Sequence, residues 1–411
     1  MSRFNYSLRH AAACMLLLAA QAQGAELRTA SKLAFDDAGT LYIADWKAAR
    51  VYAVKVPQAS AAAASPFNLQ DVQKPIATAL KVKESSLRFD DLAVQPGTGM
   101  AYISVTTGGK AAVVSIDAAG TVRRLPTADL KTFAAIGDLP AADQTFWRDL
   151  PAPALTVTDM KYHDGKLYLA GMSNRNFASA LRVFDLPFSG KARTATVEMY
   201  HPVHNQVETR APIRAMSFVT VDGVPSMVAA YTCTPLVLIP LDALQDGAHV
   251  RGKTVAELGY GNTPADMISY TMSVNGKTEE YMMLVNFNRV SNVIPVSELQ
   301  AANARPGIEK VVPFGQIAGL DVQQAPLAGA LRIDNLDDQS FVMVRRRLET
   351  DALQLVSLGK DLSFRMTDHV SEYAFRDYSF KGDPWQQQNI KPRQDVLLRQ
   401  EGVPELIKPT E

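Results

Sequence analysis

Short apolar runs recur along most of the chain, four to a unit, with Gly, Asp, Asn and Pro between them. The units open with runs such as DDLAV at 90–94 and ADMIS at 265–269, and a second run follows, as in MAYISV and YMMLVN. Third and fourth runs complete each unit, and six units cover roughly residues 27–370. Apolar runs of this length between turn residues indicate β-strands.

Four short strands in a unit of about 50 to 70 residues are typical of a β-propeller blade, and six blades can close a ring. We therefore expect an all-β fold, a β-propeller of six four-stranded blades. Seven blades are the alternative count, and a pair of β-sandwiches is the alternative architecture. The fourth runs include IATALKV at 76–82 and IEKVVPF at 308–314, and the last unit is expected to open with AGLDV at 318–322.

Three segments lie outside the repeat. Residues 1–25 combine Arg3 and Arg9 with a short apolar core and small residues, which is typical of a secretory signal peptide. The propeller is then expected over 26–376, with an insertion at about 126–152 that is rich in Pro and Asp. Residues 377–411 read as a polar C-terminal tail.

Cleavage of the signal peptide would make the mature protein periplasmic or secreted. It would also remove Cys14 and leave Cys233 alone, so we expect no internal disulfide. No later apolar run reaches the roughly 18 residues of a spanning helix, so no membrane span is expected.

Charge and motifs exclude several classes of partner. Lys+Arg and Asp+Glu both count 42, so the net charge is zero and gives no attraction to nucleic acid. The chain has no CxxCH haem attachment and no phosphate loop, and QPGTGM at 95–100 lacks the third Gly of a dinucleotide loop. We therefore expect neither haem nor a nucleotide.

The first unit, LAFDDAGTLYIADWKAARVYAVKV at 33–56, resembles a blade of the NHL, SMP-30 and YVTN extracytoplasmic propellers. Its LYIAD, the following basic residue and RVYAV carry the resemblance, which in the other units is only architectural. The resemblance implies the propeller fold, in a class that includes lactonases, scaffolds and ligand binders. SMP-30-like enzymes hold a divalent metal on the axis with Glu, Asn and Asp, a complete ligand set that we do not place in this chain.

Polar residues interrupt the apolar pattern at the starts of the first strands and in the loops after the second strands. Both places lie at one mouth of a propeller channel, where polar residues that break the pattern indicate a ligand site. The candidate ligand-binding residues are Asp45, Trp46, Asn174, Arg175, Arg214, Tyr231, Thr232, Asn288 and Arg289.

Asp91, Asp159 and Asp266 occupy equivalent places in their units and are expected to face the axis. Three carboxylates round a narrow channel repel one another unless cations neutralise them. A divalent cation such as Ca²⁺ suits oxygen ligands, whereas Lys32 and Arg214 offer neutralisation without metal. Two further interpretations are that the aspartates bind backbone N–H groups of neighbouring blades and tie the ring shut, or that they are catalytic.

A second group of potential ligands has a weaker pattern. HPVHNQVE contains His201, His204 and Glu208, but Pro202 and the loop composition give the HxxH spacing no helical face. Cys233 is expected to be a small apolar filler, because none of the loops predicted at the mouth supplies a histidine base.

The expected function is binding of a small molecule, a metal ion or a periplasmic protein at the channel mouth. One alternative is a metal-dependent hydrolase of the SMP-30-like, lactonase type, with an axial divalent metal that activates water. The other is an accessory partner of a periplasmic dehydrogenase.

Overall fold

The computed structural model describes residues 27–57, 66–126, 130–146, 149–274, 277–325, 327, 329–347, 350–360, 398 and 404–406. The predicted signal peptide lies outside these residues, as do most of the predicted tail and the end of the predicted propeller segment, including the run LSFRMT at 362–367 that was expected to be its last strand.

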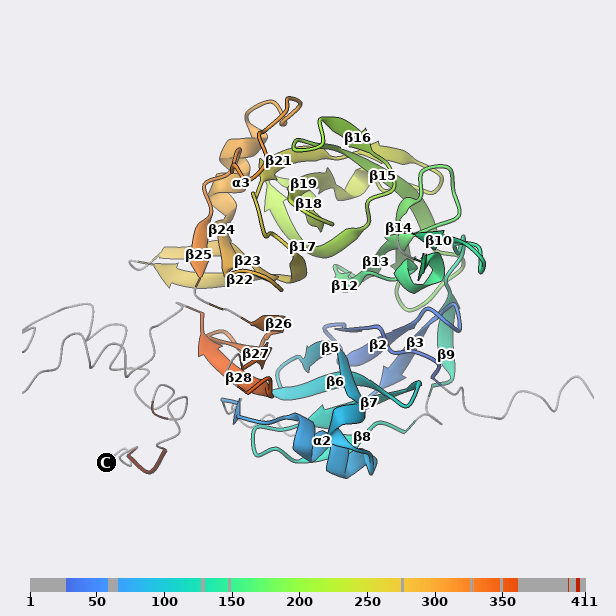
Figure 1. Ribbon diagram of the computed structural model, residues 1–411, viewed down its shortest axis with the longest axis vertical. Coiled ribbons are helices and arrows are strands. Elements are labelled where there is room, and N and C mark those ends of the chain that lie inside the picture. The colour runs from blue at the N-terminus through green and yellow to red at the C-terminus, as the bar shows by residue number, and fades with distance from the viewer. Residues whose placement is uncertain are drawn as a thin grey trace, which may run out of the picture.

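Six four-stranded antiparallel blades surround one axis, as Figure 1 shows, so the predicted six-blade propeller is confirmed. Blade 1 comprises β1 (Lys32–Phe35), β2 (Thr40–Asp45), β3 (Arg50–Lys55) and β9 (Thr132–Ala135). Blade 2 comprises β5 (Leu87–Gln95), β6 (Met100–Thr107), β7 (Lys110–Ile116) and β8 (Val122–Arg124). Blade 3 comprises β12 (Asp159–His163), β13 (Lys166–Met172), β14 (Ser179–Asp185) and β15 (Arg193–His201). Blade 4 comprises β17 (Ile213–Val221), β18 (Val224–Tyr231), β19 (Pro235–Pro240) and β21 (Lys253–Glu257). Blade 5 comprises β22 (Pro264–Val274), β23 (Lys277–Asn286), β24 (Ser291–Pro295) and β25 (Gln323–Ala325). Blade 6 comprises β26 (Ala330–Asn335), β27 (Ser340–Arg346), β28 (Leu353–Gly359) and β4 (Asn68–Leu69).

The order of the blades round the ring differs from their order in the chain. The inner strand β1 packs between β5 and β12, and β5 packs against β26. The ring therefore runs through blades 2, 1, 3, 4, 5 and 6 and closes between blades 6 and 2 (Figure 1).

Two exchanged outer strands explain this order. After β3 the chain supplies β4 to the outer edge of blade 6, where Asn68 and Leu69 pair with Val356 and Leu355. It then forms blade 2 and returns to blade 1 with β9, which pairs with β3. The expected insertion at 126–152 therefore contributes a blade strand, and the ring is closed by strands far apart in sequence.

Few elements lie outside the blades. In the part of the chain that the structure describes, the helices are α2 (Gln73–Leu80) and α3 (Val296–Asn303), and the short 3-10 turns are η1 (Glu84–Ser86), η4 (Ala152–Leu155), η5 (Leu241–Ala243) and η8 (Pro404–Leu406). The remaining strands are β10 (Thr145–Phe146), β11 (Leu150–Pro151), β16 (Gln206–Glu208) and β20 (His249–Arg251). Within the described residues, none of the helices has the length and apolar character needed to cross a membrane.

The expected strand pattern needs three corrections. IATALKV does not form an outer strand, because residues up to Leu80 belong to α2. IEKVVPF lies in a loop, and β25 takes its place as the outer strand of blade 5. AGLDV does not open blade 6: Ala318 bridges to Glu257 at the outer edge of blade 4, and the inner strand is β26.

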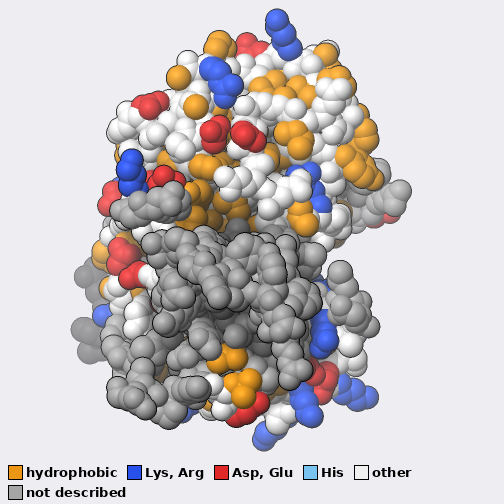
Figure 2. Space-filling view, turned by 90° about the vertical axis from the view of Figure 1, so that its left-hand side faces the viewer, with side chains coloured by type: hydrophobic (Ala, Val, Ile, Leu, Met, Phe, Trp, Pro, Cys, Tyr) orange, Lys and Arg blue, Asp and Glu red, His pale blue; other side chains and the backbone are white. Residues whose placement is uncertain are grey.

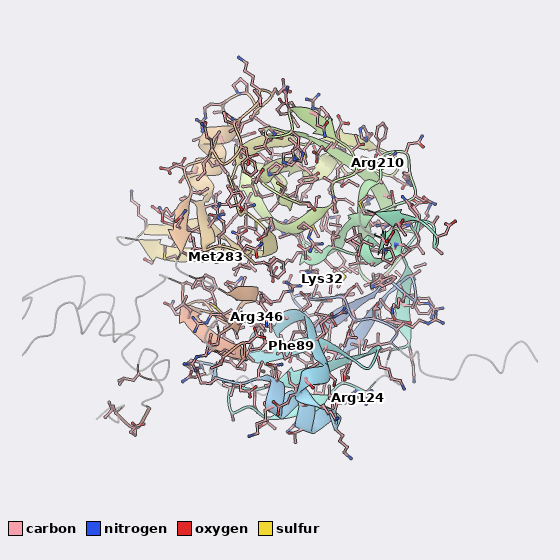
Figure 3. The ribbon with its side chains drawn as sticks, viewed as in Figure 1. Lys32, Phe89, Arg124, Arg210, Met283 and Arg346 are labelled. Atoms are coloured by element: carbon pink, nitrogen blue, oxygen red, sulfur yellow. The ribbon has the colours of Figure 1, made fainter. Side chains whose placement is uncertain are left out.

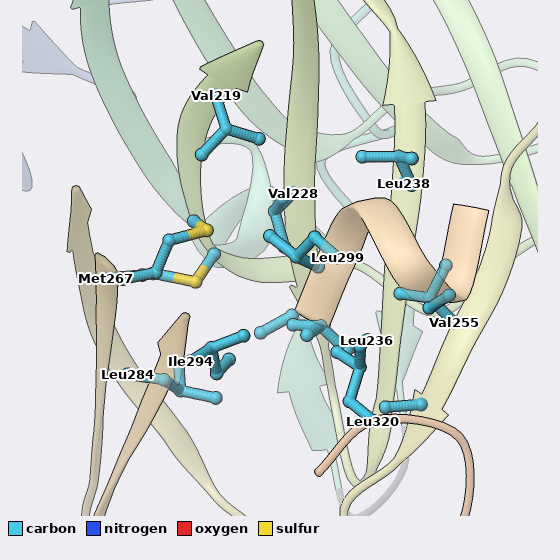
Figure 4. Packing of buried hydrophobic residues seen from close by; sticks show 14 of the residues in the cluster. Val219, Val228, Leu236, Leu238, Val255, Met267, Leu284, Ile294, Leu299 and Leu320 are labelled. Atoms are coloured by element: carbon cyan, nitrogen blue, oxygen red, sulfur yellow. The ribbon is translucent and has the colours of Figure 1, made fainter. Parts of the chain in front are cut away.

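The core lies between neighbouring blades. Figure 4 shows Met267, Leu284 and Ile294 of blade 5 facing Val228 and Leu236 of blade 4, and all five side chains are buried. Leu299 of α3 joins the same cluster. Since each middle strand is covered on both faces, its sequence reads as a continuous apolar run rather than as an alternating one.

The surface carries charges of both signs. On the face shown in Figure 2, acidic and basic side chains lie interspersed among hydrophobic ones over the described residues. This distribution agrees with the balance of 42 basic and 42 acidic residues.

Candidate ligand site in the central channel

Charged side chains surround the axis where the inner strands begin, and Figure 3 shows Lys32 near the middle of the ring. Acidic and basic residues alternate from blade to blade. We call this set the charged belt; in ring order its members are Asp91, Lys32, Asp159, Arg214, Asp266 and Arg332.

Each belt aspartate accepts a backbone N–H from the next blade. Oδ2 of Asp91 accepts the N–H of Leu33 at 2.8 Å, and Oδ2 of Asp159 accepts that of Met216 at 2.8 Å. Oδ2 of Asp266 accepts the N–H of Ile333 at 3.2 Å. These contacts are those expected of aspartates that tie neighbouring blades together.

Basic side chains compensate the three carboxylates. The Nζ of Lys32 lies 3.4 Å from Asp91 Oδ1 and 3.6 Å from Asp159 Oδ1. The Nε of Arg332 lies 2.8 Å from Asp91 Oδ1, and the Nζ of Lys161 lies 2.8 Å from Asp266 Oδ1. Both oxygens of every belt carboxylate therefore have a donor nearby. A divalent cation on Asp91, Asp159 and Asp266 stays a prediction.

Burial and neighbouring charge move the pKa values of the belt in different directions. Burial raises the pKa of Asp266, but Lys161, Lys32 and Arg332 outweigh it and hold that pKa below its ordinary value. For Asp159 burial dominates and raises the pKa, despite Lys32 and Lys161. Burial lowers the pKa of Arg214, whose guanidinium forms no hydrogen bond or ion pair with the side chains and backbone that the structure describes.

Beyond the belt the channel widens into a cavity of about 680 Å³. Every inner strand contributes lining residues from its later part, so the cavity lies at the end of the inner strands opposite the belt. Its polar and charged lining consists of Lys161, His163, Ser217, Thr220, Ser269, Thr271, Glu280, Asp334, Asn335, Asp337, Asp338 and Lys360.

Aromatic rings complete the wall. Phe35, Tyr162, Phe218 and Tyr270 line the cavity. The ring of His163 stacks on Phe218, with centroids 4.4 Å apart and planes inclined by 10°. Burial lowers the pKa of His163, which keeps its imidazole neutral near pH 7. The cavity thus offers both flat apolar surface and hydrogen-bonding groups.

Two charged side chains of the lining are held in place. Lys161 pairs with Asp266, and although burial lowers the pKa of Lys161, Asp266, Asp159 and Asp334 raise it above its ordinary value. Asp334 accepts the backbone N–H groups of Val94 and Asn335, each at 2.8 Å. Burial raises the pKa of the Asp334 carboxyl to about 6, although Lys161 opposes the shift.

The raised pKa of Asp334 predicts a pH dependence of stability. A carboxyl whose pKa is higher in the folded than in the unfolded state stabilises the folded protein fully at pH values below its unfolded pKa. This contribution is lost as the pH rises through about 6, the pKa of Asp334 in the folded state. When the pH falls from about 7.5 to about 5, the unfolding free energy of wild type should rise by roughly 1 kcal/mol relative to that of the Asp334→Asn protein, whose amide does not titrate. Urea unfolding of both proteins at the two pH values measures this; equal pH slopes would contradict it.

The residues expected to bind ligand lie outside this cavity lining. Asp45 is buried and accepts the backbone N–H groups of Arg28, Thr29 and Ala48, so it fixes the chain before β1 and the β2–β3 turn. Trp46 packs against the apolar cluster between blades 1 and 3.

The others make local contacts. Arg175 pairs with Asp138 at 2.7 Å, and the N–H of Asn174 donates to the Asp138 carbonyl. Tyr231 is buried and Thr232 donates to the Pro212 carbonyl at 3.3 Å. The N–H of Asn288 donates to Thr263 Oγ1, and Arg289 donates to the carbonyls of Leu258 and Tyr260. Their role in ligand binding stays a prediction.

Two charged residues of the cavity lining are visible in the sequence but are not among the predicted site residues. Lys161 and Asp334 each stand inside an inner strand, in DMKYH and ALRIDN, rather than at its start. A charge inside a strand that is otherwise buried needs a partner or a polar cavity.

Comparisons with known proteins do not assign the chain to a family. No protein-family model matches the chain, and no curated protein matches it. The structural neighbours include the streptogramin B lyase structure, with 11% identity, 82% of this chain and 96% of that chain covered, and a TM-score of 0.34.

Other neighbours are longer proteins. For a quinohemoprotein alcohol dehydrogenase from Pseudomonas putida HK5 the identity is 14%, the coverage 77% of this chain and 43% of that chain, and the TM-score 0.27. For a GH43 glycoside hydrolase the identity is 12%, the coverage 63% of this chain and 48% of that chain, and the TM-score 0.30. The chain therefore spans about half the length of that hydrolase. Likeness at this level carries no information about activity.

Proposed function

We propose that this protein is an exported binding module that takes a small polar ligand into the central channel cavity. The observation that carries the proposal is the cavity of about 680 Å³, to which all six inner strands contribute. Ligand pockets of roughly 300–1,000 Å³ that combine flat apolar surface with a few polar groups are typical of small-molecule sites.

The charges of the lining favour a ligand rich in hydrogen-bond donors. Among the described lining residues, Glu280, Asp337 and Asp338 are acidic, and Lys360 is the one basic side chain besides Lys161. The ammonium of Lys161 is already compensated by Asp266. Excess negative charge in a concave site attracts cations and donors. We therefore expect an amine, an amino sugar or a polyol.

The proposed export is supported by the predicted signal peptide. The proposed kinship with NHL, SMP-30 or YVTN propellers is supported by the sequence of the first blade. A lactonase-type hydrolase and a dehydrogenase partner stay predictions, since no contact among the described residues favours either of them over binding.

A panel of small amines, amino sugars, polyols and carboxylic acids, screened by thermal shift and followed by calorimetry, tests the proposal. We expect a donor-rich compound to raise the melting temperature, because a ligand that binds only the folded state stabilises it. Ser269→Trp, which places an indole in the lining, should reduce affinity at least about tenfold, a change of roughly 1.4 kcal/mol.

Thr121→Trp is the matched control, because Thr121 lies exposed on the β7–β8 turn, away from the lining residues. It should bind as wild type does. Equal affinity of the Ser269→Trp protein, or stabilisation only by carboxylic acids, would contradict the proposed site.

A further inference from the structure

Three potential metal ligands and a neighbouring carboxylate meet where blade 3 adjoins blade 4. His201 ends β15, His204 lies in the following turn, and Glu208 ends β16. Cys233 lies in the loop between β18 and β19. The ligand atoms of His201, His204 and Cys233 all lie within 4.8 Å of one another. The expectation that Cys233 has no histidine nearby is therefore wrong.

Glu208 lies against both imidazoles. Its Oε1 is 3.0 Å from Nδ1 of His201 and 2.5 Å from Nδ1 of His204. The two imidazole rings have centroids 3.8 Å apart. The carboxylate is therefore within hydrogen-bonding distance of both imidazoles, as an outer-shell partner of metal-binding histidines is.

The local backbone explains how the two histidines and Glu208 come together. The N–H of His204 donates to the carbonyl of His201, which folds the turn back, and Asn205 has a φ of 51°. β16 then pairs antiparallel with β15, with Gln206 opposite His201. Glu208 stands two residues further along β16, so its side chain lies on the same face as that of His201.

Cys233 is held in an unusual conformation. Its φ is 78°, in the left-handed region that side-chain-bearing residues rarely adopt. The Asn262 side chain donates to the Cys233 carbonyl at 3.0 Å. Backbone strain that the surroundings maintain is frequent at functional sites.

His201 has an unmet hydrogen-bonding requirement. Its side chain is 1% exposed. The Nδ1 atom has no correctly aligned hydrogen-bond partner among the described residues, although Glu208 is close. Coordination of a cation would give this buried nitrogen a well-aligned partner in place of the poorly aligned carboxylate.

We propose that His201, His204 and Cys233 bind one divalent transition-metal ion, with Zn²⁺ the preferred ion and Glu208 orienting the two imidazoles. A thiolate and two imidazoles are ligands that suit zinc and disfavour Ca²⁺ and Mg²⁺, and water can take the fourth position. Cys233 is partly exposed and His204 is 48% exposed, so the ion can reach the site from solvent. The ion joins the β15–β16 hairpin to the β18–β19 loop and is independent of the channel ligand.

The test uses the full chain after chelator treatment, with Zn²⁺ or Co²⁺ added alone. We expect one equivalent of zinc by elemental analysis. Bound Co²⁺ should show the visible bands of tetrahedral coordination and a thiolate-to-cobalt charge-transfer band. Cys233→Ser should lose that charge-transfer band. His204→Ala should lower the affinity by more than the roughly 10- to 100-fold that an outer-shell partner costs.

His249→Ala is the matched control, because His249 pairs with Glu198 and stacks on Phe177, outside the cluster. It should bind zinc as wild type does. Should the Cys233→Ser protein not fold, alkylation of wild type by iodoacetamide, read by peptide mapping at Cys233, should slow when zinc is present. Absence of stoichiometric binding by folded wild type would overturn the proposal. So would a Cys233 thiol that is alkylated equally fast with and without zinc, which would indicate a free reactive thiol.

Discussion

Asp266→Asn should lower the free energy of unfolding by about 3 to 5 kcal/mol, with or without calcium in the buffer. Oδ2 of Asp266 accepts the N–H of Ile333 from blade 6, and Oδ1 accepts the N–H of Met267 and the ammonium of Lys161. The side-chain amide of asparagine has one acceptor oxygen and one donor NH₂ group. Its NH₂ group would therefore face buried donors that the second carboxylate oxygen of Asp266 accepts in wild type. The ammonium of Lys161 would also lose its counter-charge.

Chemical denaturation of wild type and the Asp266→Asn protein measures this loss, with Asp143→Asn as control. Asp143 is exposed and forms no hydrogen bond with a described residue, so its substitution should change stability by less than about 0.5 kcal/mol. If calcium raised the melting temperature of wild type but not that of the Asp266→Asn protein, the prediction of a cation on the belt would hold instead.

The same substitution should alter acid unfolding. Because the folded state lowers the pKa of Asp266, this carboxylate contributes stability that is present above its unfolded pKa of 3.8 and is lost as the pH falls below it. Wild type should therefore lose stability more steeply than the Asp266→Asn protein below about pH 4.

Arg182→Met should prevent stable folding, with an expected loss above about 5 kcal/mol. Arg182, in β14, has no exposed surface, and its guanidinium donates to four backbone carbonyls. These belong to Gly137 at 3.0 Å, Asp138 at 3.1 Å, Thr156 at 3.4 Å and Met172 at 3.0 Å. Burial lowers the pKa of Arg182 to about 10, so it stays charged at neutral pH.

Methionine would fill part of the space but leave these buried carbonyls without donors, at about 1 to 3 kcal/mol each. Soluble yield and circular dichroism test the result. Arg193→Met is the control, because Arg193 forms a partly exposed pair with Asp185 on the same blade and should cost less than about 1 kcal/mol. An Arg182→Met protein as stable as the control would contradict the assigned role.

The number and class of blades could be predicted because each middle strand is buried on both faces and leaves a continuous apolar run. The ring order could not, since it depends on β4 pairing with β28 and on β9 pairing with β3. Each of these outer strands is short, and its partner lies in another unit of the repeat. No local periodicity records such a pairing.

The course of the chain at 318–322 also depended on tertiary contacts. Gly319 has a φ of 95°, and a Cβ at this position would lie 2.1 Å from the carbonyl oxygen of Val255. The segment therefore lies against the backbone of blade 4, which an apolar run read alone does not indicate.

For the sites, the starts of the inner strands correctly placed Asp91, Asp159 and Asp266 round the axis, because strand starts share one end of the ring. The cavity lies at the other end, where the charges of Lys161 and Asp334 indicate a polar environment but not which residues of the other strands surround them. Cys233 and His201 belong to different blades, so only the packed fold brings them into contact.

A crystal structure of the protein with the tightest-binding amine or polyol tests the central claim most directly. We expect the compound inside the channel, within hydrogen-bonding distance of Lys161 or Asp334, two residues of the cavity lining. A compound bound at the opposite end beside Arg214, or on the outer surface with the cavity empty, would contradict the proposed function.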